Sequence, residues 1–331
     1  MPRVLVIGAT GYLGQAVTQA LLRSGQHSVY GLCRSARKAP SLAAIEVIPV
    51  VCEDPVNKPE PYLDSIRHYR IDVVIDCTAA YGDSAKFLQD VKALGRERLD
   101  KFKADGIDNG PKIGYIYTSG AWVHGDSPGH VTDLDPVGTA SAPSKPLDLV
   151  GWRPQLERLV LAARDVLDVM VFRPAQLYGR GSTAWAAIFA PIAQAVADGQ
   201  PKFQVPIAPT SESPVIHVDD VAEGICLGAS KISLFGGTSV YPVFDLVSST
   251  ENIRDIVNAF GNALSVTSKT QGRTQLELVG PGDNPYLQAL GSTVRYNSAR
   301  AQQLLGWEPK RRGLVANMEV YAHAFRASMQ S

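Results

Sequence analysis

Apolar and polar positions follow two alternating patterns along the first half of the chain. Short apolar runs predict buried strands at Arg3–Ile7, Ser28–Cys33, Ala44–Val50, Asp72–Asp76, Ile113–Thr118 and Asp168–Phe172. Between them, helical spacing predicts helices at Tyr12–Ser24, Tyr62–Tyr69, Ser84–Ala104 and Gly151–Val166. Repeated strand–helix units of this kind form a parallel, doubly wound sheet with right-handed crossovers. The first half is therefore predicted to be of the α/β class.

The pattern loosens after Pro174. Helical stretches at Ala184–Asp198, Asp219–Ala229, Glu251–Leu264, Ser298–Leu305 and Gly313–Ala327 alternate with loops rich in glycine and proline. One further strand, Pro242–Val247, is expected to return to the main sheet. We therefore predict a main domain over residues 1–180, joined by 214–250. A smaller interleaved lobe would comprise residues 181–213 and 251–331.

Composition narrows the class of protein. The 331 residues are 45% hydrophobic and 19% charged, which suits a large core rather than a disordered chain. Lys and Arg together number 32, as do Asp and Glu. A balanced charge argues against a nucleic-acid-binding or anionic-membrane surface, since both need a basic excess.

Neither cysteine spacing nor hydropathy points to a metal site or a membrane. The cysteines Cys33, Cys52, Cys77 and Cys226 are scattered without metal-ligand spacing. The longest apolar stretch, Ala184–Ala197, is interrupted by Pro191 and Gln194, and it is shorter than the ~20 residues of a membrane span. A strand begins at Arg3, so no signal peptide is expected, and we predict a soluble, cytoplasmic protein without a bound metal.

The chain opens with a strand that runs directly into a glycine-rich turn, Gly8-Ala9-Thr10-Gly11-Tyr12-Leu13-Gly14. Such glycines let the backbone approach a diphosphate, and the following helix offers its N-terminal N–H groups to that anion. A tight structural turn is the alternative. Because strand, glycines and helix occur together, the pattern predicts a dinucleotide-binding fold of the Rossmann type.

The residues after the second strand bear on which dinucleotide binds. An acidic residue about 20 positions past the glycines favours NAD, whereas an arginine favours NADP. Arg34 stands at that distance from Gly14, and Ser35 and Arg37 follow it. A guanidinium suits a 2′-phosphate, although a solvated basic loop would read the same way. The sequence therefore favours NADP(H) over NAD(H).

Several segments in order resemble the extended short-chain dehydrogenase/reductases of the epimerase/dehydratase-like branch, nearly from end to end. They are Gly8–Gly14, Asp72–Ala80, Tyr117–Gly125, Phe172–Gly179, Ile216–Ala222 and Leu304–Pro309. The resemblance implies the following cofactor contacts: Gly8, Thr10, Gly11, Tyr12, Leu13, Gly14, Thr78, Ala79, Ala80, Thr118, Ser119 and Pro174. It also implies a small-molecule substrate and a possible homodimer paired through the fourth and fifth helices.

The chain departs from this family at its catalytic residues. The family's catalyst is a Tyr with a Lys four residues later, plus a Ser or Thr on the preceding strand, which together move a proton at the substrate oxygen. This sequence contains no Tyr-x-x-x-Lys. Gly151 and Gln155 stand at the Tyr and Lys positions, and Gly120 stands at the Ser/Thr position. The standard mechanism is therefore not expected.

Other residues near these positions are candidates to replace the missing groups. His124 and Tyr81 are the predicted acid–base groups, although a backbone-bonded histidine and an aromatic packing on the cofactor are the alternatives. Further predicted substrate contacts are Gly120, Trp122, Trp152, Arg153 and Tyr178. Arg153 is expected to hold a carboxylate or a carbonyl oxygen. Asp219 and Asp220 are expected to cap the helix that follows.

Two functional hypotheses follow. The first is an NAD(P)(H)-binding enzyme acting on a small carbonyl or hydroxyl compound by a non-standard mechanism, with redox and non-redox reactions as the alternatives. The second is a non-catalytic NADP-binding sensor or regulator. They differ in whether acid–base or polarising groups converge on the nicotinamide end of the site.

Overall fold

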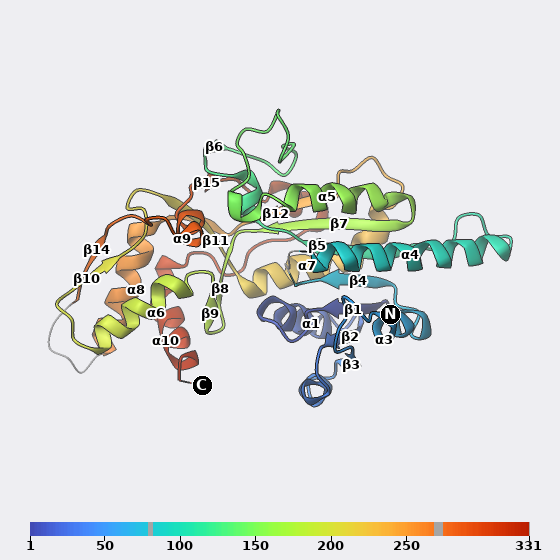
Figure 1. Ribbon diagram of the computed structural model, residues 1–331, viewed down its shortest axis with the longest axis horizontal. Helices are drawn as coiled ribbons and strands as arrows, with labels where there is room; N and C mark the ends of the chain where they lie inside the picture. Colours follow the sequence, from blue (N-terminus) through green and yellow to red (C-terminus); the bar gives the residue numbers. More distant parts are fainter. Residues whose placement is uncertain (79–81, 268–273, 331) are drawn as a thin grey trace.

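Seven parallel strands form the central sheet of the computed structural model, which describes residues 1–78, 82–267 and 274–330 (Figure 1). Across the sheet they are β3 (Ile48–Val51), β2 (Ser28–Cys33), β1 (Arg3–Ile7), β4 (Val73–Asp76), β5 (Ile113–Thr118), β7 (Leu167–Pro174) and β12 (Val243–Leu246). The chain runs outward from β1 in one direction and from β4 in the other. Open α/β sheets bind ligands at the carboxyl ends of the strands where the order reverses.

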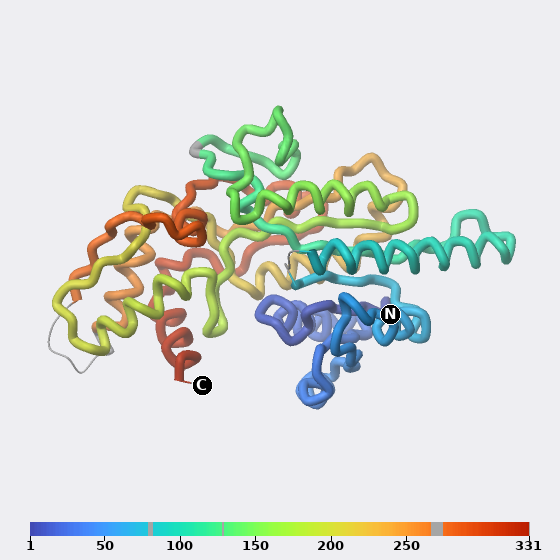
Figure 2. Tube along the Cα trace, viewed as in Figure 1, coloured from blue at the N-terminus to red at the C-terminus, as the bar shows by residue number. Residues whose placement is uncertain are grey.

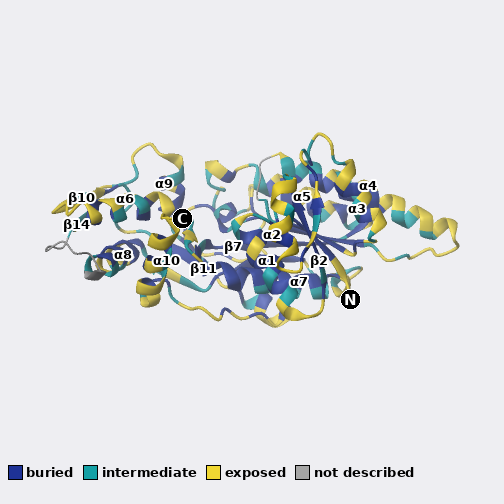
Figure 3. Ribbon diagram, turned by 90° about the horizontal axis from the view of Figure 1, so that it is seen from below, coloured by how far each residue is buried: buried dark blue, intermediate teal, exposed yellow. Residues whose placement is uncertain are grey.

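Helices cover both faces of this sheet. One face carries α1 (Tyr12–Ser24) and α7 (Val218–Phe235), and the other carries α3 (Glu60–His68), α4 (Asp83–Ala104) and α5 (Arg153–Ala162). Alternate side chains of one strand enter the two cores, because successive residues of a strand point to opposite faces. Val4 and Val6 join the α1/α7 core, whereas Leu5 and Ile7 join the other. Figure 3 shows these strands buried between exposed outer helix faces.

A smaller lobe lies beside the carboxyl end of the sheet, and it holds the C-terminus (Figure 2). Its helices are α6 (Ala186–Ala197), α8 (Ile253–Thr267), α9 (Pro285–Leu290) and α10 (Met318–Ser328). The lobe has its own core, in which the rings of Phe189 and Phe260 stack with centroids 3.8 Å apart. None of the helices in the described residues combines the length and apolar content that crossing a membrane requires.

Short strands connect the lobe to the main sheet. A four-stranded sheet contains β13 (Ser249–Asn252), β11 (Glu212–His217), β8 (Gln176–Gly179) and β9 (Ser182–Thr183). Two-stranded pairs join β10 (Lys202–Val205) to β14 (Gln275–Leu278) and β6 (Ser127–His130) to β15 (Val294–Arg295). β8 follows β7 after a single residue, so the end of the main sheet continues directly into the lobe.

The predicted α/β class is confirmed, but several boundaries differ. The strand expected at Ala44–Val50 begins only at Ile48, because a short helix α2 (Ala39–Ala43) and a turn with Glu46 at φ +65° precede it. The helix expected from Gly151 begins at Arg153. Helix α7 is capped by the His217 ring, which accepts a hydrogen bond from the Asp219 N–H, so Asp219 and Asp220 lie inside its first turn.

Candidate functional site

The turn after β1 is built around glycines that tolerate no side chain. Gly8 has φ +82°, a backbone conformation that favours glycine. A Cβ atom on Gly14 would lie 2.0 Å from the Gly8 carbonyl oxygen, so the helix can pack this closely only with glycine there. No side chain caps α1 at Gly11. Its first N–H groups therefore face the space above the turn, as in anion-binding helix starts.

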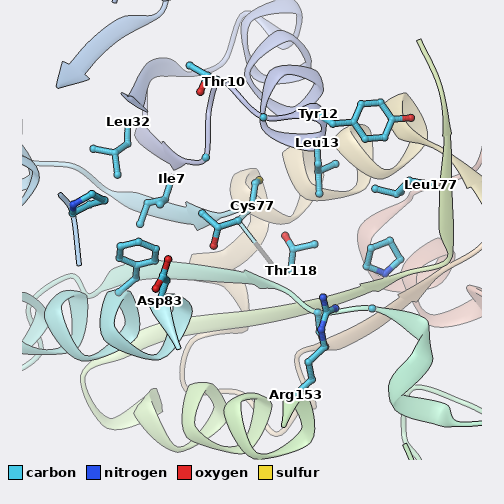
Figure 4. Close-up of a pocket in the computed structure, with 18 of the residues that line it drawn as sticks. Ile7, Thr10, Tyr12, Leu13, Leu32, Cys77, Asp83, Thr118, Arg153 and Leu177 are labelled. Carbon is cyan, nitrogen blue, oxygen red and sulfur yellow. The ribbon is translucent and has the colours of Figure 1, made fainter. Parts of the chain in front are cut away.

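A cavity of about 950 Å³ extends from this turn across the carboxyl ends of the strands to the lobe (Figure 4). Its volume is in the range of ligand and cofactor sites. The predicted cofactor contacts that line it are Gly8, Thr10, Gly11, Tyr12, Leu13, Arg34, Thr78, Thr118, Ser119 and Pro174. Gly14 supports the turn from behind, whereas Ala79 and Ala80 lie outside the described residues.

Charged side chains gather at the outer end of the cavity. Arg34 and Lys38 both line it, and so do Glu53 and Asp54 of the loop that follows β3. Ser35 and Arg37 are not among the lining residues: the Ser35 hydroxyl instead accepts a hydrogen bond from the Arg37 N–H (3.3 Å). No sequence pattern indicates that this loop faces the cavity, because the order of residues does not show which side of the sheet edge a loop covers.

A buried carboxyl lies behind the cavity at the end of β4, next to the lining residues Cys77 and Thr78. Asp76 Oδ1 accepts hydrogen bonds from the Thr78 N–H (2.9 Å) and the Thr78 hydroxyl (2.6 Å). Burial raises the pKa of Asp76, and these bonds only partly offset that effect. Burial also raises the pKa of Cys77, which lines the cavity, and therefore keeps its thiol protonated. These contacts fix the end of β4 without supplying a nucleophile.

Arg153, the first residue of α5, brings a cation to the inner end of the cavity. In Figure 4 its side chain extends from the helix toward the end of the sheet where Thr118 lies. Its Nε atom is buried and has no hydrogen-bond partner. A Cβ atom on Gly120 would lie 2.7 Å from Arg153 Nη1. The guanidinium therefore occupies the space beside Gly120, the position at which the resemblance implies a Ser or Thr.

The environment of Arg153 is desolvated but offers no close counter-ion. Burial lowers the pKa of its guanidinium, and Tyr117, Glu157 and Asp76 act in the opposite direction. None of the carboxylates among the described residues forms an ion pair with it within 4.0 Å. The Trp152 ring lies beside it, with the guanidinium carbon 5.4 Å from the ring centroid. An arginine keeps its charge in such surroundings, so the site carries an unneutralised cation.

Two aromatic residues, Trp122 of the turn after β5 and Tyr286 of α9, form a wall at the inner end of the cavity. The rings of Trp122 and Tyr286 meet edge-to-face with centroids 5.8 Å apart, and both residues line the cavity. Tyr286 donates its hydroxyl hydrogen to the Ala184 carbonyl (2.6 Å). With the Gln176 amide oriented to satisfy both of its ends, its oxygen accepts a hydrogen bond from Trp122 Nε1 (2.7 Å). These bonds use the polar atoms of the wall and leave an apolar surface.

His124, a predicted acid–base group, lies away from the cavity. Its side chain is buried, and Nε2 lies 2.9 Å from Asp245 Oδ2 on β12. Arg173 Nη1 lies 4.0 Å from the other oxygen of Asp245, and the Asp245 side chain is fully buried. The imidazole therefore belongs to a buried charge network behind the site. This position fits the alternative of a structural histidine rather than a group that touches a substrate.

The remaining predicted substrate contacts separate into two groups. Gly120, Trp122 and Arg153 come together in the cavity. Trp152 and Tyr178 do not line it: Trp152 packs at the start of α5, and the buried Tyr178 donates its hydroxyl hydrogen to the Arg311 carbonyl (3.2 Å). Tyr81 lies outside the described residues.

Comparisons with known proteins agree with this architecture. Residues 4–100 match the model of the NAD dependent epimerase/dehydratase family. A search of curated proteins by sequence gives no match. Among solved structures, the chain is similar to dTDP-glucose 4,6-dehydratase from Bacillus anthracis in complex with NAD, with 14% identity, a TM-score of 0.67, and 100% of this chain and 98% of that one covered.

Two sugar-nucleotide epimerases are also similar in structure. One is UDP-glucose 4-epimerase from Thermotoga maritima with UDP-glucose (16% identity, TM-score 0.63, 99% of each chain covered). The other is UDP-glucose-4-epimerase from Stenotrophomonas maltophila with bound NAD and formylated UDP-arabinopyranose (19% identity, TM-score 0.65, 100% of this chain and 99% of that one). At these identities the likeness establishes the fold alone.

Proposed function

Since residues 4–100 belong to the NAD-dependent epimerase/dehydratase family, we propose that this protein is an enzyme that binds a nicotinamide dinucleotide and acts on a small carbonyl or hydroxyl compound. The observation that carries the proposal is the cavity itself. It joins the glycine turn, where a diphosphate fits, to an enclosed inner end that bears one arginine and an aromatic wall. A protein that only retained the nucleotide-binding fold, without a substrate, would not need this inner end of the cavity.

The described residues fit a nicotinamide dinucleotide at defined places. The N–H groups above Gly8–Gly14 would hold its diphosphate, and Thr118, Ser119 and Pro174 would line its inner part. When bound, this cofactor supplies hydride exchange with a substrate carbon. Two similar solved structures contain NAD, which supports a nicotinamide dinucleotide as the cofactor.

We further propose that NADP(H) is preferred over NAD(H). Arg34 and Lys38 line the outer end together and offer two cations to a 2′-phosphate. Charge-assisted hydrogen bonds of this kind stabilise binding by roughly 1.5–3 kcal/mol each. Glu53 and Asp54 lie on the same part of the wall, so the preference depends on how these acids are placed relative to the two cations.

Arg153 takes the orienting role at the substrate oxygen in this proposal, in place of His124. The guanidinium lines the cavity, whereas the imidazole is buried against Asp245. A guanidinium can hold and polarise a substrate oxygen, but it does not give up its proton at physiological pH. The reaction would therefore depend on orientation and electrostatics more than on the proton transfer that the family's Tyr and Lys perform.

Binding titrations of the purified protein with NADPH and NADH test the proposal. NADPH should bind at least about tenfold more tightly, and the difference should disappear in an Arg34→Ala, Lys38→Ala double variant. Arg37→Ala is the matched control, because this neighbouring cation does not line the cavity. Failure to bind either dinucleotide would overturn the proposal.

The alternative function is a non-catalytic dinucleotide sensor, and the lost Tyr-x-x-x-Lys pattern favours it. A turnover screen of carbonyl compounds with bound NADPH separates the two functions. Substrate-dependent oxidation of NADPH would support an enzyme. Tight binding without conversion of any compound would support the sensor.

A further inference from the structure

The inner end of the cavity favours a negatively charged ligand. Of the basic residues that line the cavity within the described chain, Arg34 and Lys38 belong to the outer end, and Arg153 alone belongs to the inner end. Its Nε atom is buried without a partner. Buried polar groups in proteins are almost always hydrogen-bonded, and buried charges are paired. The missing partner of Arg153 is therefore expected to arrive with a ligand.

The neighbouring carboxylates form no ion pair with Arg153 within 4.0 Å. Glu157 binds Arg173 through both oxygens, with Arg173 Nη2 2.6 Å from Oε2 and Nε 3.1 Å from Oε1. Thr78 holds Asp76 through Oδ1, whereas the buried Oδ2 of Asp76 has no hydrogen-bond partner among the described residues. These groups attract the guanidinium from a distance without occupying its donors. Nη1 lies against Gly120, in space that a side chain at position 120 would otherwise take.

Gly120 keeps that space open. A Cβ atom at this position would meet Arg153 Nη1 at 2.7 Å, so any other residue would push the guanidinium away. A Ser or Thr at this position, which the resemblance implies, would therefore require the guanidinium to shift from the place it has in this structure.

We infer that the substrate of the proposed enzyme is a small monocarboxylate with an apolar or aromatic body, whose carboxylate forms a bidentate pair with Arg153. A planar guanidinium can pair bidentately with a carboxylate or a phosphate. Arg153 is the one cation among the described residues that line the inner end, and its single charge matches a monocarboxylate better than a doubly charged phosphate. Trp122, Tyr286 and Leu177 line the adjoining wall and fit an apolar body. The inference rests on the proposed function for the role of substrate, but the carboxylate site itself requires only Arg153 and Gly120.

Phenylacetate and its neutral analogue phenylacetamide form a matched pair of probes. Calorimetric titrations are made on the full-length protein, both with saturating NADPH and without a dinucleotide. Phenylacetate should bind at least about tenfold more tightly than phenylacetamide. The variant Arg153→Met should weaken phenylacetate binding by about 30-fold or more, while NADPH affinity stays unchanged. Arg158→Met is the control, because Arg158 lies on the same helix, is exposed and does not line the cavity.

A second variant guards against misfolding of the first. Gly120→Ala keeps the charge but displaces the guanidinium, so it should weaken phenylacetate binding by about tenfold. Equal binding of the two probes, preference for phenyl phosphate, or unchanged affinity in both variants would overturn the carboxylate site. If NADPH binds while phenylacetate does not, the inference fails and the proposed function stands. If phenylacetate binds as expected but neither dinucleotide does, the proposed function fails and the anion site stands.

Discussion

Arg153 and Arg173 both have guanidinium nitrogens shielded from solvent, but their surroundings are opposite. Arg173 lies on β7 between Glu157 and Asp245, and both of its carboxylate neighbours are buried with it. Burial lowers its pKa, but these carboxylates outweigh that effect and hold the pKa above its ordinary value. Arg153 is only half-buried and forms no ion pair with the described residues, and burial lowers its pKa. A guanidinium saturated by the protein stabilises the fold, whereas one left unpaired at a cavity is available to a ligand.

The largest expected change in the free energy of unfolding comes from removing Arg173 from its buried carboxylate neighbours. The variant Arg173→Met leaves Glu157 and Asp245 buried without their cation, which should lower the free energy of unfolding by about 3–5 kcal/mol. Chemical denaturation of the dinucleotide-free protein measures this loss. A decrease below about 1 kcal/mol would mean that the Arg173 network does not stabilise the fold as its geometry indicates.

Histidine responds to burial by losing its proton, which arginine cannot do. Burial lowers the pKa of His217 to about 4, against the attraction of Asp219 and with further lowering by Arg311 and Arg180. The unfolded chain binds this proton near pH 6.5, so stability should be full above that pH and fall as pH decreases toward 4. The loss should be at most about 3 kcal/mol.

A His217→Gln variant supplies the control for this pH dependence. Denaturation curves at several pH values should show a smaller decline between pH 6.5 and 4 in the variant than in the wild type. A direct NMR titration of the His217 ring with a midpoint near 6.5 would contradict the predicted burial effect.

Replacing the unpaired arginine should have a smaller effect of the opposite sign. Arg153→Met removes a desolvated charge and keeps an apolar side chain of similar reach, so it should raise the stability of the dinucleotide-free protein by about 1 kcal/mol. Thermal and chemical denaturation test the sign. A loss of stability would instead identify Arg153 as a counter-ion that Asp76 or Glu157 requires.

The smallest effect is expected for an exposed arginine pair. Arg96 Nη2 lies 2.6 Å from Asp165 Oδ2, but both side chains are about half exposed. Water and salt screen such a pair, so Arg96→Met should change the free energy of unfolding by less than about 0.5 kcal/mol. If Arg96→Met and Arg173→Met lowered the free energy of unfolding by similar amounts, burial would not explain the difference between the two ion pairs.

Local sequence determined the part of the site that depends on the backbone. The apolar run before Gly8 and the spacing of Gly11 and Gly14 predict a strand, a close turn and an uncapped helix start, and the structure contains all three. The predicted bounds of Arg3–Ile7, Ser28–Cys33 and Ile113–Thr118 agree with the structure for the same reason. Continuous burial on both faces leaves a clear apolar signal in the sequence.

Only the tertiary structure decided what the charged side chains do. Arg153, Arg173 and His124 are all plausible site residues by sequence position, but pairing across long separations assigns them. Asp245, 121 residues after His124, neutralises the region behind the site, and Glu157 on α5 neutralises Arg173. Arg153 receives no such partner and stands beside Gly120 instead. The spacing of residues along the chain predicts backbone structure. Whether an arginine or histidine is paired depends instead on which carboxylates the fold places next to it.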